Sequence, residues 1–221
     1  MAVTRPEFGP TLPDALRRRF GIPPVATLIV AAVVALIAMA GIVYVLTRPN
    51  VWGERVIRKG PPVFNMIYPG GAMHVAKARS GELLRLEGRR KGLEVSVVLR
   101  PLELPRFDGD VTHGLLPVYA DRFVEAAKRR MPGLQLAQEG RARVNNGVGY
   151  EVGYQRFTDD ERYTGRQVLL VPDDPKEGKG AVLLSLSLRS PGGRKLTPPE
   201  RNLAYLARKT YRSFRFGTDR G

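Results

Sequence analysis

An uncharged apolar run over residues 25–46 stands out from the rest of the chain. As a helix it would be about 33 Å long, close to the thickness of the hydrocarbon core of a bilayer. Because a helix satisfies its own backbone hydrogen bonds, such a run can lie in lipid without unpaired amides. The pattern therefore predicts a single transmembrane helix over residues 25–46.

The residues around this run leave one alternative open. The tail at 1–24 contains five prolines and is expected to be disordered, and its last arginines also fit the charged start of a signal peptide. The tripeptide Ala-Met-Ala at 38–40 resembles a cleavage site, and cleavage after Ala40 would remove the helix. The apolar run continues to Leu46, which is longer than a signal peptide needs and favours an uncleaved anchor.

Basic residues flank the run on both sides, with Arg17–Arg19 before it and Arg48, Arg55, Arg58 and Lys59 after it. The arginine triplet is the more concentrated cluster, and positive charge tends to stay on the cytoplasmic side of a membrane. We therefore expect a single-pass protein with its N-terminus in the cytoplasm and the following domain outside. The excess of arginine over lysine indicates a bacterial source. We therefore expect the helix to span the bacterial cytoplasmic membrane.

Beyond a linker expected at 47–61, short apolar stretches alternate with turn residues through a domain at 62–217. Residues 93–100 alternate apolar and polar side chains, which is typical of a strand with one buried face. Uninterrupted apolar runs at 168–171 and 181–184 predict strand centres that are covered on both faces. Strands are predicted over residues 63–68, 83–87, 93–100, 134–144, 147–157, 162–172 and 180–189, with a basic turn at 88–92.

Two helices complete the predicted domain. Residues 118–131 form an amphipathic pattern that ends at a Pro-Gly pair. The closing helix begins at Thr197, with proline at the first helical position and Glu200 at the third, which is the pattern of a capping box. The order of elements predicts an α+β fold, a mainly antiparallel β-sheet flanked by helices.

One predicted hairpin has an unusually clear signal. Asn145-Asn146-Gly147 lies between two strand patterns, and residues of this kind tolerate the positive φ of a two-residue turn. In the second strand of the hairpin, Gly149 and Gly153 share one face and leave room for a closely packed element, most simply a helix.

The opening Phe64–Gly70, the helix around Phe123, the hairpin Val144–Val152 and the closing Tyr211–Phe216 follow one another in this order. This order resembles the PsbP-like superfamily, which includes the LpqN- and DcrB-type lipoproteins. The resemblance covers about residues 62–216. It implies an α/β/α sandwich, usually outside the cytoplasm, that acts as a binding or assembly module without a common catalytic set. The run at 25–46 would replace the lipidated cysteine of the lipoproteins.

Composition narrows the classes of chemistry. The chain has no cysteine, which excludes disulfides, thiol catalysis and a lipid-attachment cysteine. Its formal charge is +15; four arginines and two acidic residues give the tail +2, so +13 belongs to the rest. Such a charge favours anionic partners such as phospholipid head groups, wall polymers or nucleic acid.

Candidate metal ligands occur together in one loop, as Asp108, Asp110 and His113. Carboxylates and imidazole are suitable ligand types for a divalent metal. The spacing matches no metal loop with a clear mechanism, however, and Asp-Gly-Asp is ordinary turn chemistry. We therefore predict no catalytic residue and no cofactor, with an envelope hydrolase or metal-binding domain that uses these three residues as the alternative.

Two basic clusters are candidates for contact with an anionic surface: Lys128, Arg129 and Arg130, and Arg208, Lys209, Arg212 and Arg215. Cations near helix C-termini also offset the helix dipole, which is a sufficient structural reason for them. Nucleic-acid binding is disfavoured because the aromatic residues fall on predicted core faces. The sequence thus predicts a non-enzymatic binding or assembly domain for another envelope protein or polymer, with binding of anionic lipid or nucleic acid as a further alternative.

Overall fold

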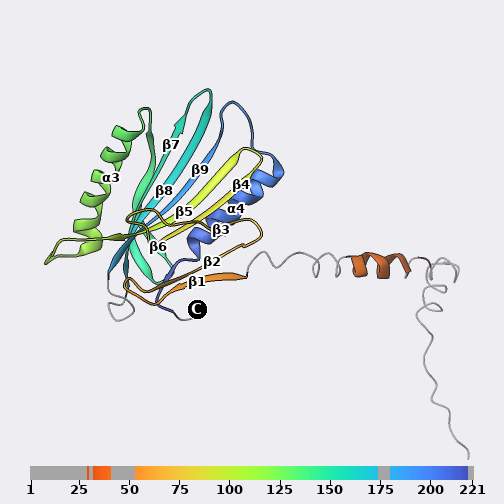
Figure 1. Ribbon diagram of the computed structural model, residues 1–221, viewed down its shortest axis with the longest axis horizontal. Coiled ribbons are helices and arrows are strands. Elements are labelled where there is room, and N and C mark those ends of the chain that lie inside the picture. The colour runs from red at the N-terminus through yellow and green to blue at the C-terminus, as the bar shows by residue number, and fades with distance from the viewer. Residues whose placement is uncertain (1–28, 30–31, 41–52, 174–179, 219–221) are drawn as a thin grey trace, which may run out of the picture. The chain divides into compact units, whose positions relative to one another are not determined.

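The computed structural model describes residues 29, 32–40, 53–173 and 180–218 (Figure 1). The chain separates into two units, Met1–Pro49 and Asn50–Gly221. In the first unit, residues 29 and 32–40 are helical, whereas the tail at 1–24 and most of the predicted span at 25–46 lie outside the described residues. Within the described residues, no helix combines the length and the apolar character needed to cross a bilayer. The transmembrane helix therefore stays a prediction.

A seven-stranded antiparallel sheet forms the centre of the second unit, with the strand order β3-β4-β5-β9-β8-β7-β6. Strands β6 to β9 follow one another as hairpins, and β9 then pairs with β5 from the earlier half of the chain. The strands are β3 (His74–Val75), β4 (Leu84–Arg90), β5 (Leu93–Leu102), β6 (Gln135–Val144), β7 (Gly147–Phe157), β8 (Glu161–Pro172) and β9 (Ala181–Pro191).

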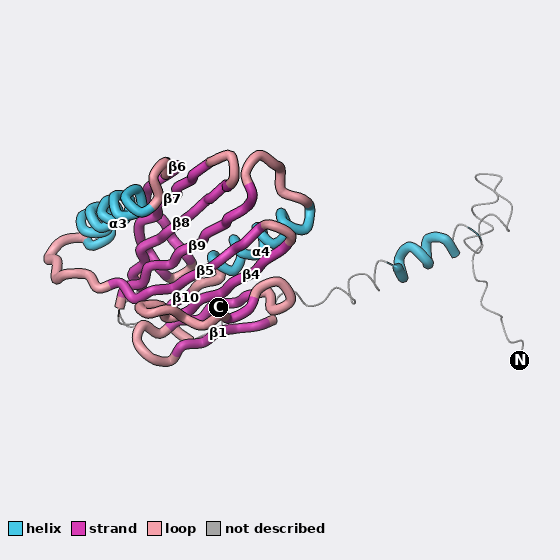
Figure 2. Tube along the Cα trace, turned by 45° about the horizontal axis from the view of Figure 1, so that its top comes forward, coloured by secondary structure: helices cyan, strands magenta, loops and turns pink. Residues whose placement is uncertain are grey.

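One long helix packs on each face of this sheet. Helix α3 (Leu116–Arg130) follows a π-helical turn, η1 (Val111–Leu115), and packs against β7 and β6, as Figure 2 shows. Helix α4 (Pro198–Arg212) packs against β4, β5 and β9. The predicted α+β fold, an antiparallel sheet flanked by helices, is confirmed.

The hydrophobic pattern explains which face each helix covers. In β5 the odd-numbered residues 93–99 are buried beneath α4, as their alternation predicts. The continuous apolar runs of β8 and β9 supply both cores: Leu169 and Leu183 pack under α3, whereas Leu170 and Leu184 belong to the cluster on the α4 side. The prediction that these strand centres are covered on both faces is therefore confirmed.

A second, three-stranded sheet has the order β1-β2-β10 and consists of β1 (Glu54–Arg58), β2 (Phe64–Tyr68) and β10 (Arg215–Phe216). Strand β1 lies within the segment 47–61 that was expected to be a linker. Its charged residues hide the strand in the sequence pattern, because β1 is stabilised mainly by antiparallel pairing with β2. Only Val56 of β1 packs against the core.

The hairpin turn does more than connect β6 to β7. The hairpin forms where it was predicted, but its turn residues are Asn145 and Asn146, and of the tripeptide only Asn145 adopts a positive φ, of 50°. The side-chain amide of Asn145 donates to the carbonyl oxygens of Arg212 (2.8 Å) and Phe214 (2.6 Å). The Asn146 side chain donates to the carbonyl of Phe216 and accepts from its N–H, both at 2.9 Å. The turn thus holds the chain that follows α4 in place and allows it to form β10.

Two local expectations were wrong. Gly149 does not make room for a helix: a Cβ there would lie 1.8 Å from the carbonyl oxygen of Leu169 on the paired strand β8. At Gly153 the close neighbour is Gln138 of β6, with its Cγ at 2.7 Å from such a Cβ. The basic turn at 88–92 is also shorter than expected, because β4 continues to Arg90 in register with β5.

Candidate functional site

The sheet face that carries α3 is only partly covered. Helix α3 lies over the β6–β7 end and reaches Leu183 at the start of β9, so the residues of β4, β5 and β9 farther along the same face, such as Arg85, Ser96 and Ser187, have no helix above them. This part of the sheet forms a hollow of about 610 Å³, which we call the polar hollow. Its lining includes Arg79, Arg85, Glu87, Ser96, Tyr163 and Ser187.

Alternation along the strands explains why the floor of the hollow is polar. In β4, Leu84 and Leu86 are buried in the cluster beneath α4, so Arg85 and Glu87 must point to the opposite face. Ser96 of β5 is paired with Ser187 of β9, and their hydroxyl oxygens lie 2.7 Å apart across the strands. The same alternation that builds one core therefore builds a hydrophilic surface behind it.

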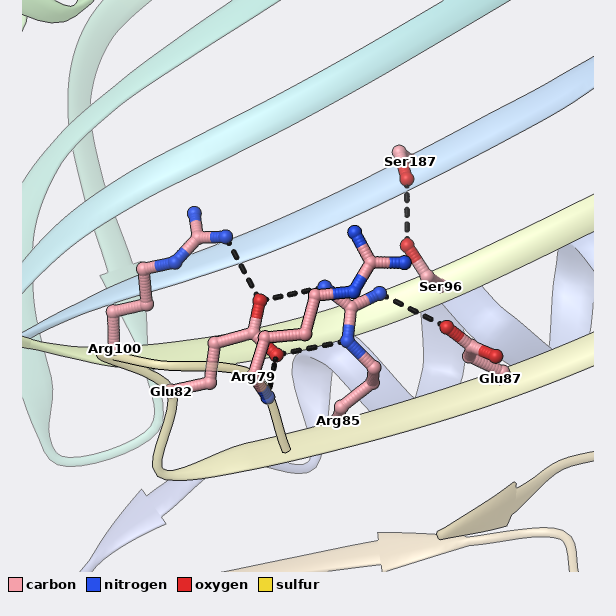
Figure 3. Close-up of polar contacts among 7 residues, drawn as sticks. All are labelled: Arg79, Glu82, Arg85, Glu87, Ser96, Arg100 and Ser187. Carbon is pink, nitrogen blue, oxygen red and sulfur yellow. Dashed lines mark hydrogen bonds and ion pairs between the residues drawn. The ribbon is translucent and has the colours of Figure 1, made fainter. Parts of the chain in front are cut away.

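An ion-pair network centred on the buried Glu82 and Arg85 supports one end of the hollow (Figure 3). Glu82 has a side chain that is only 1% exposed, and its carboxylate accepts from Arg85 through Nη2 at 2.5 Å and Nε at 2.8 Å. The same carboxylate accepts from Arg100 at 2.9 Å and from the backbone N–H of Arg79 at 3.0 Å. Arg85 also donates to Glu87 at 2.9 Å.

This network keeps Glu82 ionised. The hydrogen bonds from the Arg85 guanidinium lower the pKa of Glu82 from 4.5 to about 2, although burial acts in the opposite direction. The Glu82 and Glu87 carboxylates in turn raise the pKa of Arg85. At neutral pH both partners are charged, so the network is a fixed electrostatic support and not a proton-transfer pair.

Arg79 differs from the other charged groups of the hollow. Its backbone is held by Glu82, whereas its guanidinium makes no ion pair with any described residue. In Figure 3 its side chain extends over the sheet toward Ser96 and Ser187. The two carboxylates that line the hollow are already used, since Glu87 pairs with Arg85 and Glu94 with Arg89. The hollow therefore offers a free cation together with hydroxyl groups.

Two of the three candidate metal ligands, Asp110 and His113, belong to a helix cap. Asp110 caps η1: it accepts from the N–H groups of Thr112 (2.8 Å) and His113 (3.1 Å), and its other oxygen lies 2.6 Å from Nδ1 of His113. The Thr112 hydroxyl, above all, lowers the pKa of Asp110 to about 2. Asp108 does not join this contact, and in the described part of the chain no three acidic or imidazole groups converge on a metal-sized site.

The two basic clusters lie on helices that pack on opposite faces of the sheet, so they do not form one surface. At the end of α3, Lys128 pairs with Glu125 and Arg130 donates to the carbonyl of Ala126. Lys209 of α4 lies over the ring of Tyr205. Arg129 is exposed and Arg215 belongs to β10, whereas Arg208 and Arg212 line a separate pocket described below.

Sequence reasoning missed the residues that matter most in the hollow. Arg85, Glu87 and Arg89 alternate with apolar residues, and this signal could have predicted a polar strand face. An ordinary solvated face has the same pattern, however. Only the position of α3 over the other end of the sheet turns this face into a hollow.

Comparisons with known proteins leave the family open. No family model matches the chain, and no curated protein matches it. Solved structures similar to it include the PsbP (CyanoP) of Synechocystis sp. PCC 6803, with 12% identity over 77% of this chain and 95% of that one and a TM-score of 0.49. LpqN of Mycobacterium tuberculosis, involved in cell envelope biogenesis, has 14% identity over 71% of this chain and 88% of that one, with a TM-score of 0.41.

The Ran-binding protein Mog1p of Saccharomyces cerevisiae is a further similar structure, with 11% identity over 74% of this chain and 94% of that one and a TM-score of 0.42. A PsbP and LpqN, which the sequence resemblance led us to expect, are thus among the neighbours. Because every one of these TM-scores is below 0.5, the likeness assigns no activity or partner. The fold class rests on the sheet and helices described above, and membership of the PsbP-like superfamily stays a prediction.

Proposed function

We propose that this protein is a membrane-anchored, non-enzymatic binding module whose domain works outside the cytoplasm. Residues 25–46 would form the anchor, and the polar hollow would receive a carboxylate- or phosphate-bearing group of another envelope protein or polymer. The single observation that carries the proposal is the charge arrangement of the hollow. Its lining carboxylates are paired, whereas the Arg79 guanidinium has no ion-pair partner among the described residues.

The electrostatics of the hollow favour binding over acid–base chemistry. A general acid or base works best with a pKa near the operating pH. The pKa of Glu82 is lowered to about 2 and its carboxylate is held by two guanidinium groups, so Glu82 stays ionised near neutral pH. The arginines likewise remain charged. A preorganised set of cations and hydroxyls is suited to hold an anionic oxygen group in place.

The anchor is tested by fractionating cells that express the full-length chain. We expect the protein to sediment with membranes, to resist extraction by high salt and carbonate, and to dissolve in non-ionic detergent, because a spanning helix is held by the hydrophobic effect. A variant with Leu36→Arg and Ile37→Arg is expected to lose this behaviour. Recovery of the wild-type chain in the aqueous fraction without detergent would contradict the anchor.

The hollow is tested with Arg79→Ala in the full-length protein in detergent. A fluorescent tetraglutamate peptide serves as the probe. We expect the dissociation constant to rise about tenfold, which corresponds to the roughly 1.4 kcal/mol of a charge-assisted hydrogen bond. Binding is followed by fluorescence anisotropy at two salt concentrations.

Arg129→Ala is the matched control, because it removes an equal charge from an exposed position on α3 that lies outside the hollow. The control should change the dissociation constant less than twofold. Equal weakening by both variants would mean that only the overall positive charge attracts the peptide, and the hollow would then lose its assigned role.

A further inference from the structure

A second pocket lies on the opposite face of the sheet, beside α4. Helix α4 packs over β4, β5 and β9 and does not cover the far strands of that face. A pocket of about 230 Å³ remains between the helix and β6, β7 and β8, and we call it the helix-side pocket. Its lining includes Gln138 of β6, Gly153 of β7, Arg166 of β8 and Arg208 and Arg212 of α4.

Three guanidinium groups meet around this small volume. Arg166 is paired through Nε with Glu151 at 3.3 Å, and Glu151 is also bound by the side-chain amide of Gln138 at 2.5 Å. Arg208 and Arg212 make no ion pair with any described residue. They lie four residues apart on the helix, where like charges repel one another. Without a bound anion, the repulsion between Arg208 and Arg212 destabilises the helix slightly. An anion between the two guanidinium groups would offset this repulsion.

A buried donor adds to this picture. Tyr211 lines the same pocket and is only 2% exposed, and its hydroxyl lies beside the Glu151 carboxylate without a hydrogen bond of ordinary geometry. Burial and the nearby Glu151 carboxylate raise the pKa of Tyr211 well above its usual value, so the hydroxyl keeps its proton and remains a donor. The Tyr211 hydroxyl can therefore also donate to an oxygen of an anion bound in the pocket.

The floor of the pocket is apolar. Leu186 and Leu188 of β9 form part of the lining, and Gly153 contributes no side chain. The volume is below the range of about 300–1,000 Å³ typical of sites for drug-sized ligands, which favours a small group over a nucleotide. Guanidinium groups match the geometry of phosphate oxygens and bind them in a bidentate manner.

From these features we propose that the helix-side pocket binds a single phosphate group, with Arg208 and Arg212 as the direct ligands and Arg166 at its edge. The phosphate would belong either to free inorganic phosphate or to the head group of a phospholipid whose apolar part contacts Leu186 and Leu188. The site lies on the other face of the sheet from the polar hollow and does not depend on the function proposed above.

The experiment uses the full-length protein in non-ionic detergent and two probes, inorganic phosphate and short-chain dihexanoyl phosphatidic acid, each titrated by calorimetry. The wild-type protein is expected to bind one equivalent of at least one probe. Binding of both probes with similar affinity identifies free phosphate as sufficient. Binding of the lipid alone identifies a phospholipid head group as the source.

The double variant Arg208→Gln and Arg212→Gln is expected to weaken this binding at least tenfold, because it removes both unpaired cations. Arg201→Gln is the matched control, since this residue is exposed on the same helix and outside the pocket. It should change the affinity less than twofold. A thermal melt of each variant verifies that the fold is retained. The proposal is overturned if neither probe binds, or if the control weakens binding as much as the double variant.

Discussion

Glu82→Gln is expected to lower the free energy of unfolding by about 3 kcal/mol at pH 7, because removing one partner of a buried ion pair leaves the other charge uncompensated. Glutamine keeps one acceptor oxygen and replaces the other with a donor amide, so Arg85 would keep Glu87 as a partner but would lose one of its two hydrogen bonds to residue 82. Either Arg100 or the backbone N–H of Arg79 would lose its acceptor as well, because each shares one of the two carboxylate oxygens with Arg85. Urea denaturation followed by circular dichroism measures the change.

The dependence on pH gives a second readout of the same variant. The pKa of Glu82 is lowered from 4.5 to about 2 on folding. Its stabilising contribution is therefore complete above pH 4.5 and is lost as the pH falls from about 4.5 to about 2. The wild-type protein should lose stability steeply in this window, and Glu82→Gln should show a flatter profile there.

Glu94→Gln provides the matched control on the same sheet face. Glu94 pairs with Arg89, but the two side chains are 45% and 76% exposed, so solvent screens the interaction. Exposed pairs of this kind contribute less than about 1 kcal/mol. Similar losses for Glu82→Gln and Glu94→Gln would show that the Glu82 carboxylate is not buried with Arg85 in solution.

Phe214→Ala is expected to lower the free energy of unfolding by about 3–5 kcal/mol, the range for large-to-small changes at buried aromatic positions. Phe214 is fully buried, with ring centroids 5.9 Å from Phe64 and 5.0 Å from Phe216. The cavity would loosen the junction between α4 and β10 as well as the core beneath β2. Hydrogen exchange of the backbone amides is therefore expected to increase first in β10, and urea denaturation gives the overall loss.

Phe157→Ala serves as the comparison for this substitution. Phe157 lies at the end of β7, is half exposed and contacts the guanidinium of Arg162 at 4.9 Å. Its removal should cost less than about 1 kcal/mol, since little apolar surface is lost from the core. If Phe214→Ala were as mild as Phe157→Ala, the aromatic cluster would not be part of a closely packed core.

The candidate sites could be predicted from the sequence only in part. The capping box at Thr197 and Glu200 was predicted, because the spacing of these residues is a local property of one helix; in the structure the Glu200 carboxylate accepts from Thr197 and from Arg194. Asp110 and His113, two of the three candidate metal ligands, lie in contact because Asp110 caps the start of the helix. Glu82 was missed, because its partners Arg85 and Arg100 come from two different strands.

By itself, the sequence determined the two long helices and the long strands of the large sheet, together with the faces that they bury. Alternation in β5, the continuous apolar runs of β8 and β9 and the hairpin at Asn145 all report on neighbours that are close along the chain, where side-chain periodicity follows directly from backbone geometry. It also determined the uncharged run at 25–46, from which the predicted anchor follows.

Only the tertiary structure decided that β9 pairs with β5, that α3 covers just one end of its sheet face, and that the asparagines of the turn hold β10. These are contacts between residues far apart in the chain, and they depend on how whole elements fit together. Both proposed sites arise where a helix leaves part of a sheet face uncovered, which no local pattern of residues encodes.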